Sequence, residues 1–378
     1  MKVTLSHLGL VCALGKSVEE ILKNIKALSV PKLNKRLVAG REMPFGAAPV
    51  PTTKRMRCFD LLDNAVAQIQ RPLENIKKEY PLQRVGIVLG SSNTGIHEAQ
   101  KHINQWMETQ KCPTDFSFDE IELGTPVCYL KEKTGFKGPA FTVSTACSSS
   151  AKAFASARNL LQADICDVVL VGGVDSCCDF ALNGFYALEA LSPQISVPFS
   201  KNRQGINLGE GAALFIMEKD KNGIEVAGIG ESSDAYHLTH PDPEGQGALC
   251  AMKKALEEAC IPPSTIDYIN LHGTGTIAND SMESQAVYQL FGGDVLCAST
   301  KPLTGHALGA SGAIEAALCW LMIRENFIIP HFYDGAYDPQ LPPIHLANGH
   351  ESRKIRTVLS NSFAFGGSNA SLILRREV

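Results

Sequence analysis

The sequence predicts an α/β fold of two duplicated halves, and this prediction rests on an alternation of elements and on an internal repeat. Short β-branched runs at residues 84–90, 167–173 and 266–273 are typical of buried parallel strands. Helical patterns occupy residues 148–162, 246–260 and 311–324. This alternation over 378 residues, a length that suits two lobes, indicates the α/β class.

The helical segments differ in how much of their surface they are expected to bury. Segments 148–162 and 311–324 are rich in alanine and poor in charge, so we expect them to be buried on most sides. Segment 246–260 is amphipathic, with lysines and glutamates opposite one apolar face. That face consists of Ala248, Leu249, Met252, Ala255, Leu256 and Ala259.

The internal repeat relates the first part of the chain to the second. Residues 140–158 and 295–317 share the order strand, small-residue turn, buried helix, and place Cys147 and His306 in comparable turns. A glycine-rich turn and an outgoing strand follow 62 residues after Cys147, at Gly209, and 60 residues after His306, at Gly366. The two spacings favour duplicated halves, 1–222 and 223–378, that meet in the polar segment 218–223.

Composition excludes several classes of protein. A net charge of −4 and a pI near 6.2 give no electrostatic reason to expect nucleic acid as a partner. No apolar run is long enough for a membrane span, and the first residues predict a β-strand rather than a signal peptide. The 12 cysteines form no CxxC pair and often lie in apolar runs, which predicts buried free thiols and a cytoplasmic location.

Cys147 is the first candidate for chemistry. It lies after a predicted strand and before an alanine-rich helix, in the sequence STACSSSA. The free N–H groups and the dipole of a helix N-terminus favour a thiolate, which can take an acyl group from a thioester. The alternative is a small buried cysteine that packs like alanine.

Two histidines in glycine-rich turns are the next candidates. His272 follows a predicted strand and His306 precedes a predicted helix, and a neutral imidazole in either place can donate to a developing oxyanion. Each could instead be structural. His237 and His240 are spaced like a metal pair, but no further ligands follow at suitable spacing, so no metal is expected.

Four motifs in order, TACSSSA, LHGTGT, STKPLTGHALGASGAIE and NSFAFGGSNASL, closely resemble the elongating β-ketoacyl-(acyl carrier protein) synthases. The resemblance covers nearly the whole chain. It implies the thiolase fold, two duplicated halves in a five-layer αβαβα arrangement, and a 3-oxoacyl-(acyl carrier protein) synthase activity. By this resemblance Cys147 is the nucleophile, and His272 and His306 bind the malonyl thioester carbonyl during decarboxylation. The backbone N–H groups of Cys147 and Phe365 would form the oxyanion hole, with Phe365 also as the gate.

The resemblance implies further roles. Lys301 and Glu315 match the pair that supports the His306 loop, and Thr239, Thr274 and Thr276 match residues that hold a phosphopantetheine arm. That arm would be supplied by the carrier protein, so no cofactor of the enzyme itself is expected. The implied partners are acyl carrier protein, malonyl-carrier protein and a second subunit in a homodimer or a heterodimer.

Two positions depart from the family pattern. Ala364 stands where the gating loop usually has glycine, so a positive φ there would restrict the swing of Phe365. His240 stands where serine is common beside the pantetheine tunnel. The ACSSS motif is similar to that of polyketide synthases. Together with this motif, the two departures favour specialised chain building, such as a polyene pathway, over ordinary fatty acid synthesis.

Other readings are weaker. A biosynthetic thiolase needs a second cysteine in the C-terminal glycine-rich loop, where this chain has FAFGGSN. An initiating or chalcone-type enzyme would lack the histidine of TGH, and a GxSxG hydrolase motif is absent. A non-catalytic chain-length partner would lack Cys147, although this chain could be the active half of a heterodimer with one.

Overall fold

One mixed sheet passes through the molecule in the computed structural model, which describes residues 2–27, 32–219 and 221–376. Its strands are β1 (Val3–Val11), β4 (Val85–Gly90), β5 (Ala140–Val143), β6 (Val168–Asp175), β7 (Gly211–Lys219), β8 (Ile224–Ser233), β9 (Tyr268–Asn270), β10 (Leu296–Ala298), β11 (His345–Leu346), β12 (Thr357–Phe363) and β13 (Ser368–Arg375). The order across the sheet is β11-β10-β9-β12-β13-β8-β1-β7-β6-β4-β5. A separate hairpin joins β2 (Asn34–Val38) to β3 (Arg41–Phe45).

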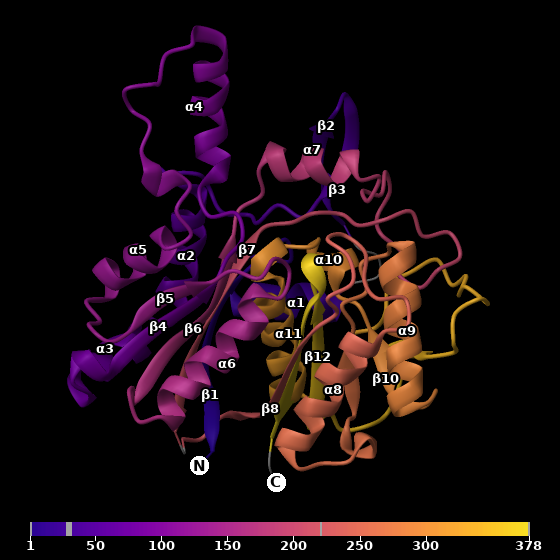
Figure 1. Ribbon diagram of the computed structural model, residues 1–378. Coiled ribbons are helices and arrows are strands. Elements are labelled where there is room, and N and C mark those ends of the chain that lie inside the picture. Colours follow the sequence, from indigo (N-terminus) through magenta and orange to yellow (C-terminus); the bar gives the residue numbers. More distant parts are fainter. Residues whose placement is uncertain (1, 28–31, 220, 377–378) are drawn as a thin grey trace.

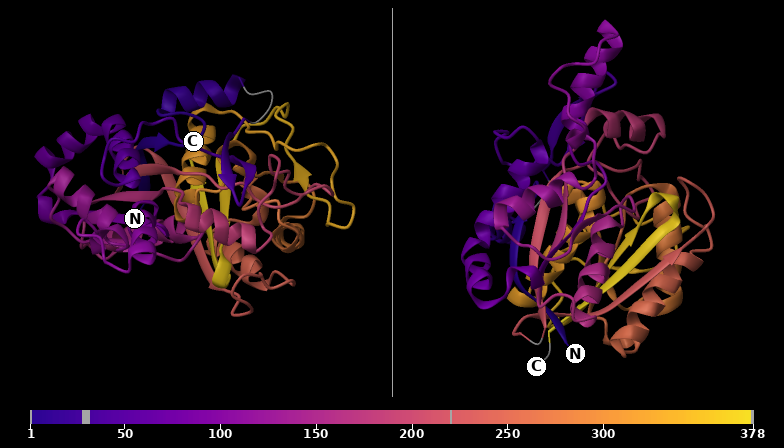
Figure 2. Two further views of the ribbon diagram at one scale, coloured as in Figure 1. Left: turned by 90° about the horizontal axis from the view of Figure 1, so that it is seen from above. Right: turned by 60° about the vertical axis from the view of Figure 1, so that its left-hand side comes forward.

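Helices flank the strands of this sheet (Figure 1). They are α1 (Val18–Ala27), α2 (Arg57–Gln68), α3 (Gln70–Glu79), α4 (Ile96–Thr109), α5 (Thr125–Thr134), α6 (Ser149–Gln162), α7 (Asp179–Ala187), α8 (Gln246–Ala259), α9 (Ile277–Phe291), α10 (Lys301–Thr304) and α11 (Ser311–Glu325). Helix α4 projects away from the body of the molecule (Figures 1 and 2).

The strand order shows the duplication directly. The first half runs β5-β4-β6-β7-β1 and the second β10-β9-β12-β13-β8, so equivalent strands take equivalent places. Their directions match as well, because β4 is parallel to β5 and β6 while β9 is parallel to β10 and β12. The halves join where Glu225 of β8 pairs with Thr4 on one side and Arg375 on the other. The start of β1 and the end of β13 therefore lie close together, as Figure 2 shows.

Helices and sheet halves form five layers. Helices α6 and α11 contact each other and strands of both halves, so they form the central layer. Helix α2 covers β1 and β7 on one outer face, and α8 covers β8 and β13 on the other. This confirms the αβαβα arrangement that the resemblance implied. Residues 311–323 of α11 are all buried, as expected for a helix between two sheets.

Most sequence-based expectations for the elements are confirmed. The run 84–90 contains β4, the run 167–173 covers all but the last two residues of β6, and the two strands pair in parallel. The six apolar residues predicted on one face of α8 are all buried. The strand predicted in 266–273 is shorter, Tyr268–Asn270, which leaves His272 in the turn behind it. All twelve cysteines are free thiols, and eight of them are buried.

The boundary between the halves falls after β7. Residue 220 of the polar segment 218–223 lies outside the described residues, and the proposed division between residues 222 and 223 stays a prediction. Among the helices of the described ranges, none has the length and apolar composition that would let it cross a membrane.

Candidate active site

The turn between β5 and α6 carries Cys147. Ala146 before it has a φ of 52°, in the left-handed region that a residue with a side chain enters at a cost. Helix α6 begins two residues later, at Ser149, whose hydroxyl accepts a hydrogen bond from the Thr145 amide at 2.9 Å. This tight turn leaves Cys147 buried, with 7% of its surface exposed, yet places it in the wall of a cavity.

His272 is held by a carboxylate from the second half. It follows β9, and Glu283 of α9 accepts hydrogen bonds from the amides of His272 and Gly273, both at 2.7 Å. Burial raises the pKa of the Glu283 carboxyl to about 7, and these two amide bonds oppose that rise. The backbone of His272 is thereby fixed at the end of its strand.

His306 is held by the first half of the chain. Its amide donates to the carbonyl oxygen of Asn207 at 2.7 Å, and its own carbonyl accepts from the Gly209 amide at 2.9 Å. The predicted repeat equated the turns of Cys147 and His306. The structure adds that the glycine-rich turn after Asn207 supports the His306 backbone.

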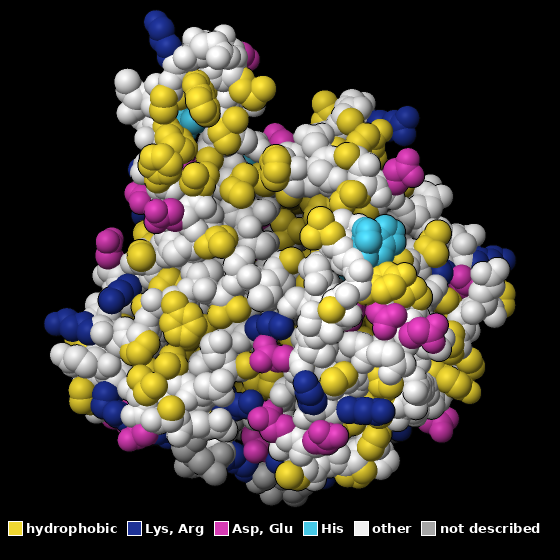
Figure 3. All heavy atoms as spheres, in the orientation of Figure 1, with side chains coloured by type: hydrophobic (Ala, Val, Ile, Leu, Met, Phe, Trp, Pro, Cys, Tyr) yellow, Lys and Arg dark blue, Asp and Glu magenta, His cyan; other side chains and the backbone are white. Residues whose placement is uncertain are grey.

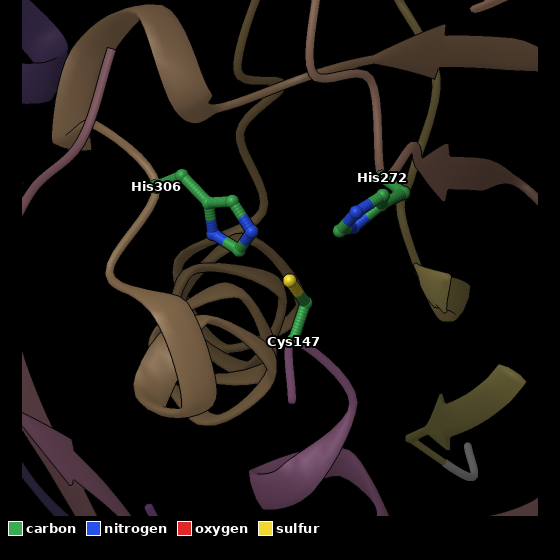
Figure 4. Close-up of side chains that lie close together, drawn as sticks. All are labelled: Cys147, His272 and His306. Carbon is green, nitrogen blue, oxygen red and sulfur yellow. The ribbon is translucent and has the colours of Figure 1, made fainter. Parts of the chain in front are cut away.

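The structure brings Cys147, His272 and His306 together. The sulfur and one nitrogen of each imidazole lie within 4.8 Å of one another, and the two rings are 5.5 Å apart and nearly perpendicular, at 87°. Figure 4 shows the sulfur and both imidazoles facing a common space. The Nε2 atom of His306 is buried without a hydrogen-bond partner among the described residues, while its Nδ1 lies 2.6 Å from the Ser311 hydroxyl.

The three side chains are uncharged at rest. Burial, and then the charge of Lys301, lower the pKa of His272 and of His306 well below the usual value, so both imidazoles are neutral at pH 7. The expected resting thiolate is wrong, because burial raises the pKa of the Cys147 thiol to about 11. Lys301 and a hydrogen bond from the Phe365 backbone lower that pKa without offsetting the burial.

Lys301 and Glu315 lie behind His272 rather than in the cavity. The Lys301 ammonium donates to Glu315 Oε1 and to the His272 carbonyl oxygen, both at 2.5 Å, and lies 3.3 Å from His272 Nδ1. An ammonium has only donors, so Nδ1 accepts and Nε2 of His272 carries the proton toward the cavity. The sequence placed this pair at the His306 loop, but its direct contact is with His272.

The loop around Phe365 differs from the expectation. Ala364 has a φ of −103° and a ψ of 153°, an extended conformation, so the predicted restriction at this residue is wrong. The positive φ values fall on Gly366, at 81°, and Gly367, at 72°. The Phe365 ring stacks on Phe185 of α7, with centroids 5.6 Å apart.

The predicted arm-binding threonines line the same cavity. A cavity of about 320 Å³ opens beside Cys147, and Thr239, Thr274 and Thr276 all contribute to its wall. The hydroxyls of Thr274 and Thr276 lie 2.9 Å apart. Figure 3 shows a hollow in this face of the molecule with apolar side chains and histidine beside it.

His240 lines this cavity, and His237 lies beside His240. Their Nδ1 atoms are 3.3 Å apart, but the Thr239 amide donates to Nδ1 of His237 at 3.1 Å, which occupies its lone pair. Nδ1 of His237 is therefore not available to a cation, and the absence of a metal at this pair stays a prediction. In the described part of the chain, Cys147, His272 and His306 are the one group of three possible metal-ligating side chains that converge.

A cation at this group would meet the nearby charge of Lys301 and a protonated thiol. The N–H groups of the two imidazoles suit a carbonyl oxygen better than the group suits a cation.

Two family profiles match the chain: "Beta-ketoacyl synthase, N-terminal domain" over residues 64–222 and "Beta-ketoacyl synthase, C-terminal domain" over residues 224–333. The chain belongs to the β-ketoacyl synthase family. The family is one of condensing acyltransferases, so the chain is an enzyme of this class, as its sequence predicted.

Individual relatives agree with this assignment. The chain is 31% identical to 3-oxoacyl-[acyl-carrier-protein] synthase 2 of Coxiella burnetii over 99% of its own length and 98% of the relative's. It is 38% identical to nodulation protein E of a Rhizobium species over 64% of its length and 63% of the relative's. Among solved structures, the ketosynthase ApeO of Xenorhabdus doucetiae, in complex with its chain length factor ApeC, matches with a TM-score of 0.94 and 37% identity. That match covers 100% of this chain and 98% of the other.

Sequence reasoning missed several residues that build the synthase site. Glu283 and Asp280 anchor the turns at residues 272–275, since Asp280 accepts from the Gly275 amide at 3.2 Å. No helix was predicted in the segment that forms α9, so nothing in the sequence pattern pointed to this pair. Phe185 and Arg203 also line the cavity, but they come from segments with no local feature that points to the site.

Proposed function

We propose that Cys147 accepts an acyl group from a carrier-bound thioester and that His272 and His306 then decarboxylate a malonyl thioester to extend it. The observation that carries this proposal is the arrangement of one thiol and two neutral imidazoles around a common space in the cavity wall. Two neutral donors suit an oxygen that gains negative charge, which is what a thioester carbonyl does on decarboxylation.

The first step is acyl transfer. The Cys147 sulfur attacks the thioester carbonyl, the carbon–sulfur bond to the arm breaks, and the arm leaves as a thiol that carries the Cys147 proton. The backbone N–H groups of Cys147 and Phe365 would stabilise the oxyanion, and the Phe365 backbone already faces the sulfur. Neither histidine is placed as a resting imidazolium partner for a thiolate, because both are neutral.

The second step is decarboxylation. The Nε2–H groups of His272 and His306 would donate to the malonyl thioester oxygen as the bond to the carboxylate breaks and CO2 leaves. Lys301 fixes the required tautomer of His272 by its contact with Nδ1. The unpartnered Nε2 of His306 is free for the same purpose when the Ser311 hydroxyl donates to Nδ1.

The third step forms the new bond. The enolate carbon attacks the acyl carbonyl on Cys147, a carbon–carbon bond forms and the bond to sulfur breaks. Cys147 leaves as a thiolate and takes a proton from water. The product is a 3-oxoacyl thioester on the second arm, so acyl carrier protein and malonyl-carrier protein are the proposed partners. The proposed enzyme carries no cofactor of its own, since the carrier supplies the phosphopantetheine arm.

A second subunit is also proposed. Strand β5 is an edge strand of the sheet, and Phe141 on it is 38% exposed, which supports a partner along this edge. The match to a ketosynthase solved with its chain length factor favours a heterodimer with a related non-catalytic subunit over a homodimer. Sedimentation of the chain alone and of the chain mixed with such a subunit distinguishes a homodimer from a heterodimer. A clean 40.7 kDa species in both experiments would contradict either dimer. A cytoplasmic location is part of the proposal.

The test of the chemistry uses Cys147→Ala, with Cys297→Ala as a matched control, since Cys297 is a buried cysteine outside the cavity. Wild-type protein incubated with acyl-carrier protein should gain the acyl mass on Cys147, and malonyl-carrier protein should then release CO2 and 3-oxoacyl product. Cys147→Ala should lose the adduct and the product yet stay folded and release CO2 from malonyl thioester. Full condensation by this variant would contradict the assignment.

A further inference from the structure

Arg203 presents an unused edge to the catalytic cavity. It lies between α7 and β7, and its side chain is 5% exposed. One terminal nitrogen is fully committed, because Nη1 donates to the Ser200 carbonyl oxygen at 2.8 Å and to Asp338 Oδ2 at 2.6 Å. These two bonds fix the plane of the guanidinium.

The opposite edge of the guanidinium has no partner among the described residues. Nε is buried and makes no hydrogen bond, and its nearest carboxylate oxygen, Asp280 Oδ2, is 3.9 Å away. Asp280 Oδ2 already accepts from the Phe199 amide at 2.8 Å. Nη2 likewise makes no hydrogen bond, but unlike Nε it is not a fully buried atom without a partner. Arg203 lines the cavity.

Such an edge is costly unless something occupies it. A buried donor without an acceptor loses its hydration and gains nothing in return, and this loss is larger for a charged group. The Nε and Nη2 hydrogens of a guanidinium point the same way, so they can share one oxygen or hold two. The geometry therefore calls for an oxygen acceptor that enters from the cavity.

The charges nearby decide what kind of oxygen fits. An anionic ligand at this edge would meet the carboxylates of Asp280 and Asp338, both on the same guanidinium. A phosphate or carboxylate is disfavoured there, whereas an uncharged carbonyl oxygen is not. The wall of the same cavity also carries the polar side chains of Thr276 and Asn279, which suit an amide.

We infer that the Nε–Nη2 edge of Arg203 binds an amide carbonyl oxygen of the pantetheine arm and so positions the thioester for Cys147. This inference rests on the proposed function. Arg203 is a positioning residue in it, because it contacts the arm and not the reacting atoms.

The experiment measures single-turnover acylation of Cys147 with three thioesters of one acyl group. Their thiols are pantetheine, with two amides; N-acetylcysteamine, with one; and butanethiol, with none. Arg203→Gln should slow acylation about 10-fold or more with each thioester that contains the amide contacted by Arg203. This is the loss expected when a hydrogen bond to a charged group is removed. Acylation by the butanethiol thioester should change less than about twofold, and adding a 4′-phosphate to pantetheine should leave the ratio of wild type to variant unchanged.

The matched control is Arg57→Gln. Arg57 is equally buried and also pairs with a carboxylate, Glu210, but it does not line the cavity. Its replacement should affect all three thioesters equally. An equal loss with all three in Arg203→Gln would make Arg203 merely structural, and a loss seen only with the phosphate present would assign it to the phosphate. Either result overturns the inference.

Wild-type protein provides a test that does not depend on folding of a variant. Thioether analogues of the arm are compared in which each amide in turn becomes an ester, which keeps the carbonyl, or two methylenes, which do not. Loss of one particular carbonyl should weaken binding about 10-fold or more, and the inference fails if neither carbonyl matters. If no thioester acylates Cys147 in the wild type, the proposed function itself fails; acylation unaffected by Arg203→Gln refutes only the inference.

Discussion

Replacing Lys301 by methionine should separate two roles of the Lys301–Glu315 pair. Both side chains are at most 2% exposed, and the ammonium contacts Glu315 Oε1 and the His272 carbonyl oxygen, each at 2.5 Å. Glu315 Oε2 already lacks a hydrogen-bond partner in the described part of the chain, so removing Lys301 leaves the whole carboxylate buried and uncompensated. Breaking a buried pair in this way costs about 3–5 kcal/mol of unfolding free energy.

A double replacement should remove most of that cost without restoring the chemistry. Lys301→Met with Glu315→Leu exchanges the ion pair for apolar groups of similar volume, which is often nearly neutral for stability. The donor to His272 Nδ1 is still missing, however, and the imidazole is free to take the tautomer that has no proton on Nε2. We expect both variants to decarboxylate malonyl thioester about 10²-fold more slowly, as for loss of one oxyanion donor.

Urea unfolding followed by circular dichroism gives the stability, and single-turnover release of labelled CO2 gives the rate. The expected pattern is a large loss of stability in Lys301→Met, a small one in the double variant, and a slow rate in both. Recovery of the rate together with stability would show that Lys301 acts through folding alone, and the argument about His272 would be wrong. An undisturbed unfolding free energy in Lys301→Met would refute the buried-pair argument.

Three further predictions concern the site. His272→Ala and His306→Ala should each slow CO2 release about 10²-fold and acylation of Cys147 much less; equal losses in both steps would mean that the histidines activate the thiol. Alkylation of Cys147 by iodoacetamide, followed on its own peptide by mass spectrometry because Cys112, Cys128 and Cys260 are exposed thiols too, should still be accelerating above pH 9. Burial raises the pKa of Cys147 to about 11, whereas a plateau near pH 7 would indicate a thiolate. Ala364→Gly should leave acylation rates across chain lengths within about twofold, because Ala364 has a negative φ.

Much of the fold and the reacting residues could be predicted from the sequence because they depend on local patterns. The burial of β4 and of α6 can be predicted from local composition, because β4 is a β-branched run and α6 is an alanine-rich segment. Cys147, His272 and His306 each stand in a short motif whose order along the chain is informative. The similar spacings from Cys147 to Gly209 and from His306 to Gly366 reflect the repeated strand order that the sheet shows.

The supporting residues were harder to predict because their partners are distant in sequence. Glu283 contacts the turn eleven positions before it, and Arg203 contacts Asp338 across 135 positions. Each would look like an ordinary surface charge in a sequence window. Only the packing of α9 and of the loop after α7 against the cavity reveals them.

The expectations about the Cys147 thiolate and about Ala364 proved wrong because each depends on features outside its local motif or position. A helix N-terminus favours a thiolate, but how deeply the sulfur is buried depends on how α6 and α11 pack between the sheet halves, and burial dominates the pKa of Cys147. Likewise the need for a positive φ was assigned to Ala364, while the residues of the turn that have a positive φ are Gly366 and Gly367.

A protonated resting thiol beside two neutral imidazoles decides where the proton of Cys147 goes during acyl transfer. The pKa of each imidazole lies well below its usual value, so neither ring is a good acceptor for the proton of Cys147, which leaves with the departing arm. That leaves both imidazole N–H groups available for the malonyl oxygen in the next step.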